Sequence, residues 1–590
     1  MAELCKHAAS AAGLTENSDA ETAATTQDEA TDDAETATTT HDEASDDGSD
    51  GADEPLELVI VGAGPHALAL LLRLLDDAPD ESGDFFVGLG SAPRSSRKSW
   101  SDLEKRRCGD DVARRVLDRV RVVDGSGAWL GTWDAQFAAL EIPHLRSTYD
   151  QHPCPYDSFA LQQFVVKNGR ERDVVDLDAS VRTTQESGGD DGCDCDAPKG
   201  KGCGFKGNFR LPSTKLFRDF VDHLIDQYPR VRGCVTEGVV DRVDRLDGNL
   251  ARVRLATGET LVARRVVLAV GPAAAPRLPD WAAPGLGKHA WDVVAAAARG
   301  EPVVEAGDRV AVVGGGLTSA HLCFVAERRG AKPTLLARRR TLRVSQYDLD
   351  LAWLGWRTRP GKIARFLSKR ATPEDRLAML RAARRGGSVS PEARRGLDRG
   401  GATVLADVDV VYGEVDGGAR YLDTAEGDRL GPFDKVWYAT GGAPGVAASP
   451  LFSGLLADRP VAVVGGYPVL HASLRWDADT PVYVVGAAAA LALGPDALNL
   501  AGTRMSSCRA ASVFRDSLRA RCLGSLSAAD AAAAELVRAR RLEELVVDFV
   551  PKKGTVVVRG RPGDAAKGSV RRKVQGEAAP AASRGRKKGG

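Results

Sequence analysis

The chain has 590 residues, more than one ordinary domain holds, and this length favours two or three domains. Its formal charge of −1 is nearly neutral, and no run approaches the roughly 18 apolar residues that a membrane-spanning helix needs. Residues 1–14 lack the long apolar core of a signal peptide, and Glu3 argues against a transit peptide. We therefore expect a cytoplasmic protein without a membrane partner, whose ten cysteines are reduced thiols.

The two ends of the chain are charged in opposite senses. No Lys or Arg occurs between Lys6 and Arg73, and residues 16–54 are dense in Asp, Glu, Thr and Ala. Such a segment buries too little apolar surface to offset the entropy lost on ordering, so we predict disorder over 1–54. The end of the chain, 551–590, is rich in Lys and Arg, which predicts a solvated, disordered basic tail. Nucleic acid is not an expected partner, because no aromatic residues interleave these cations.

A strand, a glycine turn and a helix follow Pro55. The apolar run Leu58–Val61 predicts a strand buried on both faces, and residues 66–75 predict an apolar helix. In a dinucleotide-binding turn, the first glycine permits the sharp turn and the second lets the backbone approach a pyrophosphate. The motif positions here are Gly62, Gly64, Pro65 and, in place of the usual third glycine, Ala67. The alternative is an ordinary strand-turn-helix without a nucleotide, and it is disfavoured because the motif occurs twice.

The strand expected after this helix is displaced along the chain. Residues 85–89 could form it, but no acid follows them, and residues 92–119 are polar, basic and poorly periodic. Residues 120–123 are a better second strand, and Asp124 follows them directly. We therefore interpret 78–119 as an insertion and Asp124 as the acid that binds a ribose hydroxyl. The alternative is that Asp124 is a turn residue in the sequence Asp-Gly-Ser-Gly.

A second copy of the motif lies at residues 309–328. Residues 310–313 predict the strand, Gly314 and Gly316 the turn, and Ser319 the opening of the helix. The next strand, 333–337, ends in Arg338, Arg339 and Arg340, which are placed to bind a 2′-phosphate. This pattern predicts NADPH rather than NADH as the coenzyme, and a solvated basic run is the alternative.

Further stretches, together with the two glycine motifs, resemble a known family. They read IPHLRSTYDQHPCPYDSFALQQF at 142–164, PSTKLFRDFVDHL at 212–224 and VWYATGG at 436–442. The combination resembles the flavin-dependent N-hydroxylating monooxygenases and their bacterial and fungal relatives over about residues 55–520. The linker fingerprint of flavin monooxygenases, Phe-x-Gly-x-x-x-His, matches only in part, at Gly285 and His289, because Ala283 stands in the Phe position. A surface histidine is the alternative for His289.

The resemblance implies an α/β fold with two Rossmann-like dinucleotide-binding domains, one for FAD and one for NADPH, the second inserted in the first. The expected parts are an FAD domain at 55–300 with insertions at 78–119 and 184–208, an NADPH domain at 301–435, a return to the FAD domain at 436–520, and a C-terminal helix at 521–550. The resemblance also implies cofactor contacts at Gly441 and Gly486. A helix beginning near Ala497 would point its N-terminus at the flavin, with Asn499 in its first turn and Asp496 as its cap.

Some residues stay open to two interpretations. Cys193, Cys195 and Cys203 have no standard zinc spacing and no nearby His, so a flexible surface insertion is favoured over metal or redox chemistry. His152 is either a residue of the active-site region or a structural histidine. No metal site and no catalytic acid or base is assigned, because in such enzymes the cofactor carries the chemistry.

The activity implied by the resemblance is the oxidation of NADPH by FAD, followed by reaction with O2. A C4a-hydroperoxyflavin would then hydroxylate a nucleophilic small-molecule substrate such as an amine. The alternative is a non-enzymatic or weakly active FAD-binding protein with a redox-regulatory role. A disulfide reductase is disfavoured, because Cys108 and Cys154 are isolated from one another in the sequence.

Overall fold

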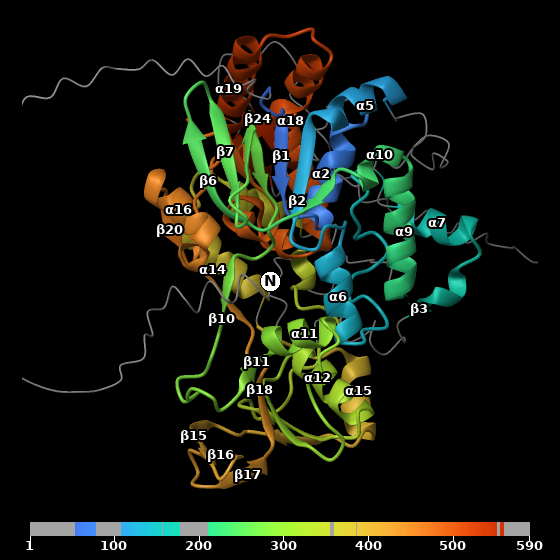
Figure 1. Ribbon diagram of the computed structural model, residues 1–590, viewed down its shortest axis with the longest axis vertical. Coiled ribbons are helices and arrows are strands. Elements are labelled where there is room, and N and C mark those ends of the chain that lie inside the picture. Colours follow the sequence, from blue (N-terminus) through green and yellow to red (C-terminus); the bar gives the residue numbers. More distant parts are fainter. Residues whose placement is uncertain are drawn as a thin grey trace, which may run out of the picture.

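The structure is a computed structural model that describes residues 54–77, 108–155, 157, 159–176, 210–353, 359–384, 386–544, 546–550 and 555–559. The disorder predicted for residues 1–54 falls outside this range except at Glu54, and so do the possible strand at 85–89 and Cys193, Cys195 and Cys203. Two layered α/β units lie one above the other along the long axis of the molecule, with the polypeptide crossing between them (Figure 1).

The first unit is built on a five-stranded parallel sheet with β1 at its centre. All four residues of β1 are buried, as its uninterrupted apolar run predicts. Helix α2 (Pro65–Leu74) packs against the long helix α18 (Thr503–Cys522), and apolar side chains of both join the core around the sheet. In spatial order the strands are β22 (Val482–Val484), β9 (Val266–Leu268), β1 (Leu58–Val61), β2 (Val120–Asp124) and β5 (Val235–Glu237).

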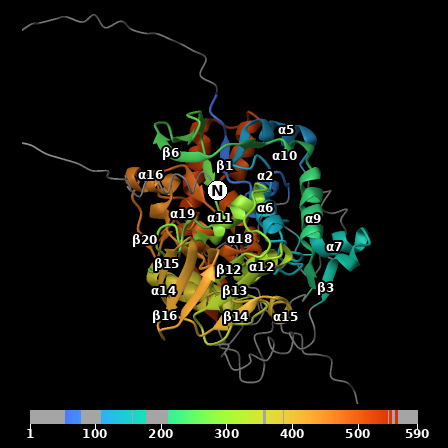
Figure 2. The same cartoon turned by 60° about the horizontal axis from the view of Figure 1, so that its bottom comes forward.

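The second unit repeats this plan with its own five-stranded parallel sheet and its own core, and Figure 2 brings it forward. In spatial order the strands are β11 (Lys288–His289), β18 (Lys435–Tyr438), β12 (Arg309–Val313), β13 (Lys332–Ala337) and β14 (Thr403–Ala406). The helices that contribute to this core are α11 (Ala290–Ala298), α12 (Leu317–Arg328) and α15 (Pro391–Arg399).

The second unit interrupts the first between two neighbouring strands of its sheet. The chain leaves after β9 and returns at β22, and these two strands pair in parallel. The outgoing strand β10 (Ala274–Pro276) and the returning strand β19 (Gly442–Pro444) pair in antiparallel fashion. The expected α/β fold, with one Rossmann-like unit inserted in the other, is therefore confirmed.

Smaller elements surround the two sheets. Two three-stranded antiparallel sheets consist of β6 (Val240–Leu246), β7 (Leu250–Leu255) and β8 (Thr260–Ala263), and of β15 (Val410–Asp416), β16 (Ala419–Thr424) and β17 (Arg429–Phe433). Pairs of short strands are β3 (Val174–Asp176) with β4 (Arg210–Pro212), and β20 (Val463–Val464) with β21 (Tyr467–Pro468). Helices beside these elements are α6 (Gly131–Ala139), α7 (Ala160–Lys167), α9 (Thr214–Asp226), α13 (Arg359–Leu367), α14 (Pro373–Arg384) and α16 (Pro450–Asp458).

The end of the expected insertion at 78–119 contains a helix that the sequence analysis missed. Helix α5 covers Asp110–Asp118 and leads directly into β2. It buries Ala113, Val116 and Leu117 along one side, while its arginines pair with its own aspartates on the exposed side. The spacing of these apolar residues is helical, but the many charges between them hid it.

The C-terminal part departs from the single helix expected at 521–550. Helix α18 ends at Cys522, and α19 covers Ala528–Glu544. The chain then forms strand β23 (Val546–Val550), which pairs with β24 (Thr555–Arg559), so part of the tail expected to be disordered at 551–590 is a strand. The stretch from 546 to 550 reads VVDFV, and its β-branched and aromatic residues favour a strand over a helix.

Buried charges fasten α19 to the first sheet. Arg265, beside β9, donates to the Glu57 carboxylate at 2.9 Å and also pairs with Glu535 of α19. Ser517 of α18 donates to the same Glu535 at 2.5 Å. All three charged side chains are almost fully buried, so removing Arg265 would leave the Glu535 carboxylate in the core without its cation.

Candidate dinucleotide sites

The first glycine turn joins β1 to α2, and its two glycines are constrained differently. Gly62 has a φ of +99°, and a Cβ there would lie 2.6 Å from the carbonyl oxygen of Ala269, so the chain itself requires glycine. Gly64 has extended backbone as the N-cap of α2, and a Cβ there would meet nothing within 4 Å. Pro65 begins the helix, and Ala67 is fully buried against the sheet.

Asp124 ends β2 beside this turn. Its Oδ2 accepts a hydrogen bond from the backbone N–H of Ala63 at 2.9 Å. Its Oδ1 accepts from the N–H of Ser126 at 2.8 Å and from the Ser126 hydroxyl at 2.5 Å. The carboxylate therefore fixes both the glycine turn and the turn that follows β2, which fits the turn interpretation and also places a charged acceptor at the strand end.

Gly486 and Asn499 approach the same turn from the returning segment. Gly486 follows β22 with a φ of +73°, and a Cβ there would lie 3.3 Å from ring atoms of His66, in the first turn of α2. His66 Nδ1 bonds with the Ser506 hydroxyl at 2.8 Å, and burial lowers the pKa of His66 to about 4. Asn499 Oδ1 accepts from the N–H of Ala501 at 2.9 Å.

The helix expected near Ala497 is absent at that position. Two short 3₁₀ turns, Pro495–Leu498 and Leu500–Gly502, precede α18, which begins at Thr503. Asp496 is consequently not a helix cap: it is fully buried and pairs with Arg359 of α13 at 2.7 Å. The reason is local, because Gly494 with a φ of +95° and Pro495 set a tight turn before any α-helix can form.

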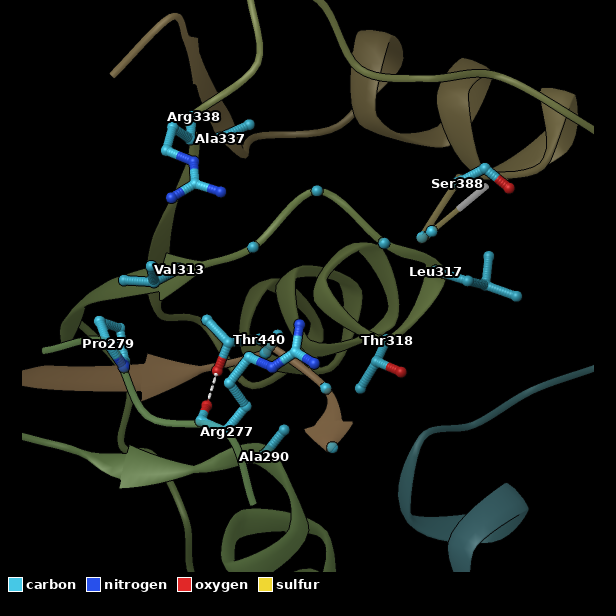
Figure 3. A pocket seen from close by; sticks show the side chains of 18 of the residues that line it. Arg277, Pro279, Ala290, Val313, Leu317, Thr318, Ala337, Arg338, Ser388 and Thr440 are labelled. Carbon is cyan, nitrogen blue, oxygen red and sulfur yellow. Dashed lines mark hydrogen bonds between the residues drawn. The ribbon is translucent and has the colours of Figure 1, made fainter. Parts of the chain in front are cut away.

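The second glycine turn joins β12 to α12 and opens into a cavity of about 1420 Å³ (Figure 3). Gly314 has a φ of +144°, and a Cβ there would lie 2.4 Å from the carbonyl oxygen of Ala439. Gly316 lines the cavity, and its would-be Cβ has only an ordinary contact of 3.8 Å with Gly387. Thr318 lines the cavity, whereas the buried Ser319 hydroxyl donates to the carbonyl of Gly316 at 2.6 Å.

The cavity wall is strongly cationic. Arg338 and Arg339 follow β13, are exposed, and form no ion pair with any described residue. Arg340 differs, because it faces Asp407 at 3.8 Å and does not line the cavity. Figure 3 shows Arg338 and Arg277 on either side of the glycine turn. Against three aspartates, the lining contains seven arginines, namely Arg146, Arg277, Arg338, Arg339, Arg343, Arg381 and Arg384.

Three of these arginines were not predicted to belong to a site, although Arg146 lies within the stretch 142–164 that carries the family resemblance. Arg146 donates to the carbonyls of Ser345 and Gln346 and, at 2.6 Å, to the Ser388 hydroxyl, so it joins the first unit to a loop of the second. Arg277 comes from the outgoing linker and Arg384 from α14. Because they lie far apart along the chain, only the fold brings them to one cavity.

His289 and Gly441 connect the two linkers beside the cavity. Gly441 has a φ of +77°, and its carbonyl accepts from the N–H of Arg277 and bonds with His289 Nε2, each at 3.0 Å. His289 Nδ1 accepts from the N–H of Trp291 at 3.2 Å, and burial lowers the pKa of His289. His289 is only 3 % exposed, so the interpretation as a surface histidine is wrong.

His152 lies in the core of the first unit. It is fully buried, packs edge-on against Phe220 of α9, and contacts the Arg504 guanidinium at 3.3 Å. It is not among the residues that line the cavity. These contacts fit the structural interpretation.

The structure thus separates the proposed cofactor residues into two groups. Gly314, Gly316, Arg338, Arg339 and Gly441 line one cavity, whereas the residues proposed for the first site gather at the carboxyl ends of β1, β2 and β22. Among the described residues, no three His, Cys, Asp or Glu side chains form a metal-binding cluster. In the same part of the chain, no helix is both long and apolar enough to cross a membrane.

Comparison with known sequences gives a local match to a broad family. Residues 131–353 match the family described as pyridine nucleotide-disulphide oxidoreductase, a range that contains the second glycine turn. A stretch of 112 residues is 35% identical to an indole-3-pyruvate monooxygenase, YUCCA1, of Oryza sativa subsp. japonica. That stretch is 18% of this chain, and the chain spans about a quarter, 27%, of the length of that relative.

Comparison with solved structures covers most of the chain. The ornithine N-hydroxylase of Kutzneria sp. 744, solved with reduced FAD, NADP+ and L-ornithine, superposes with a TM-score of 0.53 and 16% identity, covering 79% of this chain and 100% of that one. Ornithine hydroxylase of Pseudomonas aeruginosa and L-lysine 6-monooxygenase of Pseudomonas syringae each give a TM-score of 0.50 and 15% identity, covering 80% of this chain and all of theirs. The chain therefore has the fold of these flavoprotein monooxygenases.

Proposed function

We propose that this protein is an FAD- and NADPH-dependent monooxygenase that hydroxylates a nucleophilic substrate such as an amine. The observation that carries the proposal is the pair of glycine turns in which the first glycine is required by the chain and the later one, Gly64 or Gly316, faces space. Such space is what a pyrophosphate needs at a helix N-terminus. The similarity to solved N-hydroxylases supports the same assignment.

In this proposal each unit holds one nucleotide. The turn after β1, with Asp124, Gly486 and Asn499, would hold FAD, and Asp124 would accept from its ribose. The turn after β12 would hold the NADPH pyrophosphate, and Arg338 and Arg339 would donate to its 2′-phosphate. The flavin, when bound, supplies hydride acceptance and oxygen activation. The protein would order both nucleotides, and the linkers, which are joined by the bond between His289 and Gly441, would hold the two units together beside the cavity.

The spectrum of the purified protein, recorded before and after anaerobic addition of NADPH, tests this proposal. We expect a yellow protein with one FAD per chain that bleaches with NADPH much faster than with NADH. O2 is then readmitted together with an amine substrate, first lysine and then ornithine. NADPH consumption should yield the N-hydroxylated form of that amine. If all of the consumed O2 is released as hydrogen peroxide, and no added amine lowers that yield, hydroxylation is contradicted.

A non-enzymatic redox-regulatory flavoprotein is the second candidate. Its discriminating result is a protein that binds FAD at the first turn but stays yellow under excess NADPH. The unpaired arginines at the end of β13 favour the enzyme, because they have no ion-pair partner among the described residues and suit a phosphate.

A further inference from the structure

One face of α14 forms the side of the cavity that adjoins the first unit. Leu377, Leu380, Arg381 and Arg384 all line the cavity, and their spacing of 3, 4 and 7 residues puts them on one side of the helix. Leu380 is buried in the core of the first unit, which fixes the orientation of this face. The face therefore combines an apolar half and a cationic half.

Tyr467 of β21 lines the same cavity as this face. It is 7 % exposed, and its hydroxyl forms no hydrogen bond with any described residue. Burial raises the pKa of the Tyr467 hydroxyl, and the charges of Arg384 and Arg381 oppose that rise. Both guanidinium groups are thus within electrostatic reach of the phenol, and all three groups are hydrogen-bond donors.

The two arginines are not equivalent. Arg384 is held by Asp348 at 2.7 Å and by the carbonyl of Pro495 at 3.2 Å, so its charge is compensated and its position fixed. Arg381 is exposed and forms no ion pair with any described residue, so its guanidinium is available to a ligand in the cavity. A ligand with one negative charge would pair with Arg381, whereas an ammonium ion would face two guanidinium groups of which only Arg384 is already paired with a carboxylate.

We infer that this group, Arg381, Arg384 and Tyr467, binds the carboxylate of a substrate whose remaining part is apolar and lies against Leu377, Leu380 and Leu498. Leu498 precedes Asn499 in the chain, so the apolar side of the cavity adjoins a residue proposed for the flavin site. The inference rests on the proposed function for the identity of the ligand as a substrate. It favours an apolar monocarboxylate, such as an apolar amino acid, over a diamine or a dibasic amino acid.

Isothermal titration calorimetry on the FAD-loaded protein tests the inference with three ligands that share one phenylpropyl skeleton and differ in the end group: 3-phenylpropanoate, 3-phenylpropanamide and 3-phenylpropylamine. We expect 3-phenylpropanoate to bind at least tenfold more tightly than the other two. Arg381→Ala should remove this preference, and Tyr467→Phe should weaken it several-fold. NADP+ affinity should be unchanged in Arg381→Ala, and the control variant Arg340→Ala should behave as the unmodified protein toward all ligands.

Two results would overturn the inference. One is binding of the amine or the amide as tightly as the carboxylate. The other is a loss of NADP+ affinity in Arg381→Ala as large as its loss for 3-phenylpropanoate, because Arg381 would then belong to the coenzyme site. Calorimetry requires no turnover, so failure of the proposed function is seen separately: Arg381-dependent binding of 3-phenylpropanoate by a protein that does not oxidise NADPH would retain the inference and reject the monooxygenase.

Discussion

The turn after β1 and the turn after β12 both begin with a glycine that the chain's own backbone requires, with would-be Cβ contacts of 2.6 Å and 2.4 Å. They differ at the end of the neighbouring strand. In the first unit Asp124 is already bonded to Ala63 and Ser126, whereas in the second Arg338 and Arg339 have no ion-pair partner among the described residues. The strand-end side chain of the first site is thus held in place by the protein itself. Those of the second site carry positive charge that no described acid pairs with, so a phosphate of the ligand would be their partner.

Substitution of Gly64 should have the largest effect on this comparison. Because a Cβ at Gly64 meets nothing within 4 Å, Gly64→Val should fold, but its side chain should occupy the space proposed for the pyrophosphate. We expect soluble, colourless protein with less than about a tenth of the FAD, since even one blocked phosphate contact removes charge-assisted bonds. Absorbance at purification measures this.

Gly62→Val is the matched control for this experiment. Its Cβ would collide with the Ala269 carbonyl, so this variant should be insoluble or unfolded by circular dichroism. Stoichiometric FAD in Gly64→Val would show that the first turn is not the flavin site.

Removal of both arginines at the second turn should have the second-largest effect on nucleotide binding. In the double variant Arg338→Ala with Arg339→Ala, each lost charge-assisted bond should cost about 1.5 kcal/mol or more, so NADPH should bind roughly 100-fold more weakly. NADH, which has no 2′-phosphate, should bind almost unchanged. Arg340→Ala is the control, because Arg340 faces Asp407 and lies outside the cavity. An equal loss for both coenzymes would reject the 2′-phosphate assignment.

The helix after each glycine turn contains a histidine, half-buried at His66 and buried at His321, and this predicts acid sensitivity. Burial lowers the pKa of His66 in α2 and of His321 in α12 to about 4, against 6.5 when exposed. Between pH 6.5 and 4 these histidines are therefore protonated in the unfolded chain but neutral in the folded protein. The free energy of unfolding falls as the pH is lowered across that range. From pH 7 to pH 5 the loss should be about 2 kcal/mol per histidine.

Urea unfolding at pH 7 and pH 5 measures this loss, and His321→Leu should reduce it. His471 gives the opposite sign, because hydrogen bonding to Glu543 at 3.2 Å raises the pKa of His471. Its contribution should be present below pH 6.5 and disappear as the pH rises through its raised value. A His321→Leu variant with the same pH dependence as the parent would contradict the role of burial.

The smallest expected effect concerns Asp124. Asp124→Asn keeps the size of the side chain but cannot accept at both oxygens, so it loses a bond to Ala63 or Ser126 together with the charged acceptor for a ribose. We expect FAD binding to weaken about tenfold, the effect of roughly 1.4 kcal/mol. Ser126→Ala disturbs only the turn. If it weakens FAD as much as Asp124→Asn does, Asp124 acts as a turn residue alone.

Local patterns in the sequence were sufficient to predict both Rossmann-like units. The apolar runs at β1 and β12 and their glycine turns are contiguous signals, and the structure places all of them as expected. The returning strand β22 and the end of β18 were also visible, because an apolar strand running into glycine is a short-range pattern. The helical start near Ala497 failed because Gly494 and Pro495 override the apolar pattern that follows them.

The composition of the cavity could not be predicted in the same way. Arg146 lies in the stretch 142–164 that carries the resemblance, but no local pattern brings its side chain to one cavity with Arg277 of the outgoing linker and Arg384 of α14. The burial of His289 likewise depends on Gly441, 152 residues away. Contacts between residues so far apart in the chain depend on the topology of the fold. They cannot be predicted from a short stretch of one sequence.

The packing of α2 against α18 has a consequence for synthesis of the chain. About 430 residues separate the end of α2 at Leu74 from the start of α18 at Thr503. At a synthesis rate of roughly 5 to 20 residues per second, α18 is made about 20 to 90 s after α2. The apolar face of α2 stays without its packing partner for that time. The inserted unit, whose strands lie between Lys288 and Tyr438, can complete its sheet well before then. We therefore expect the nascent chain to depend on a chaperone that covers α2, and the inserted unit to be protease-resistant first.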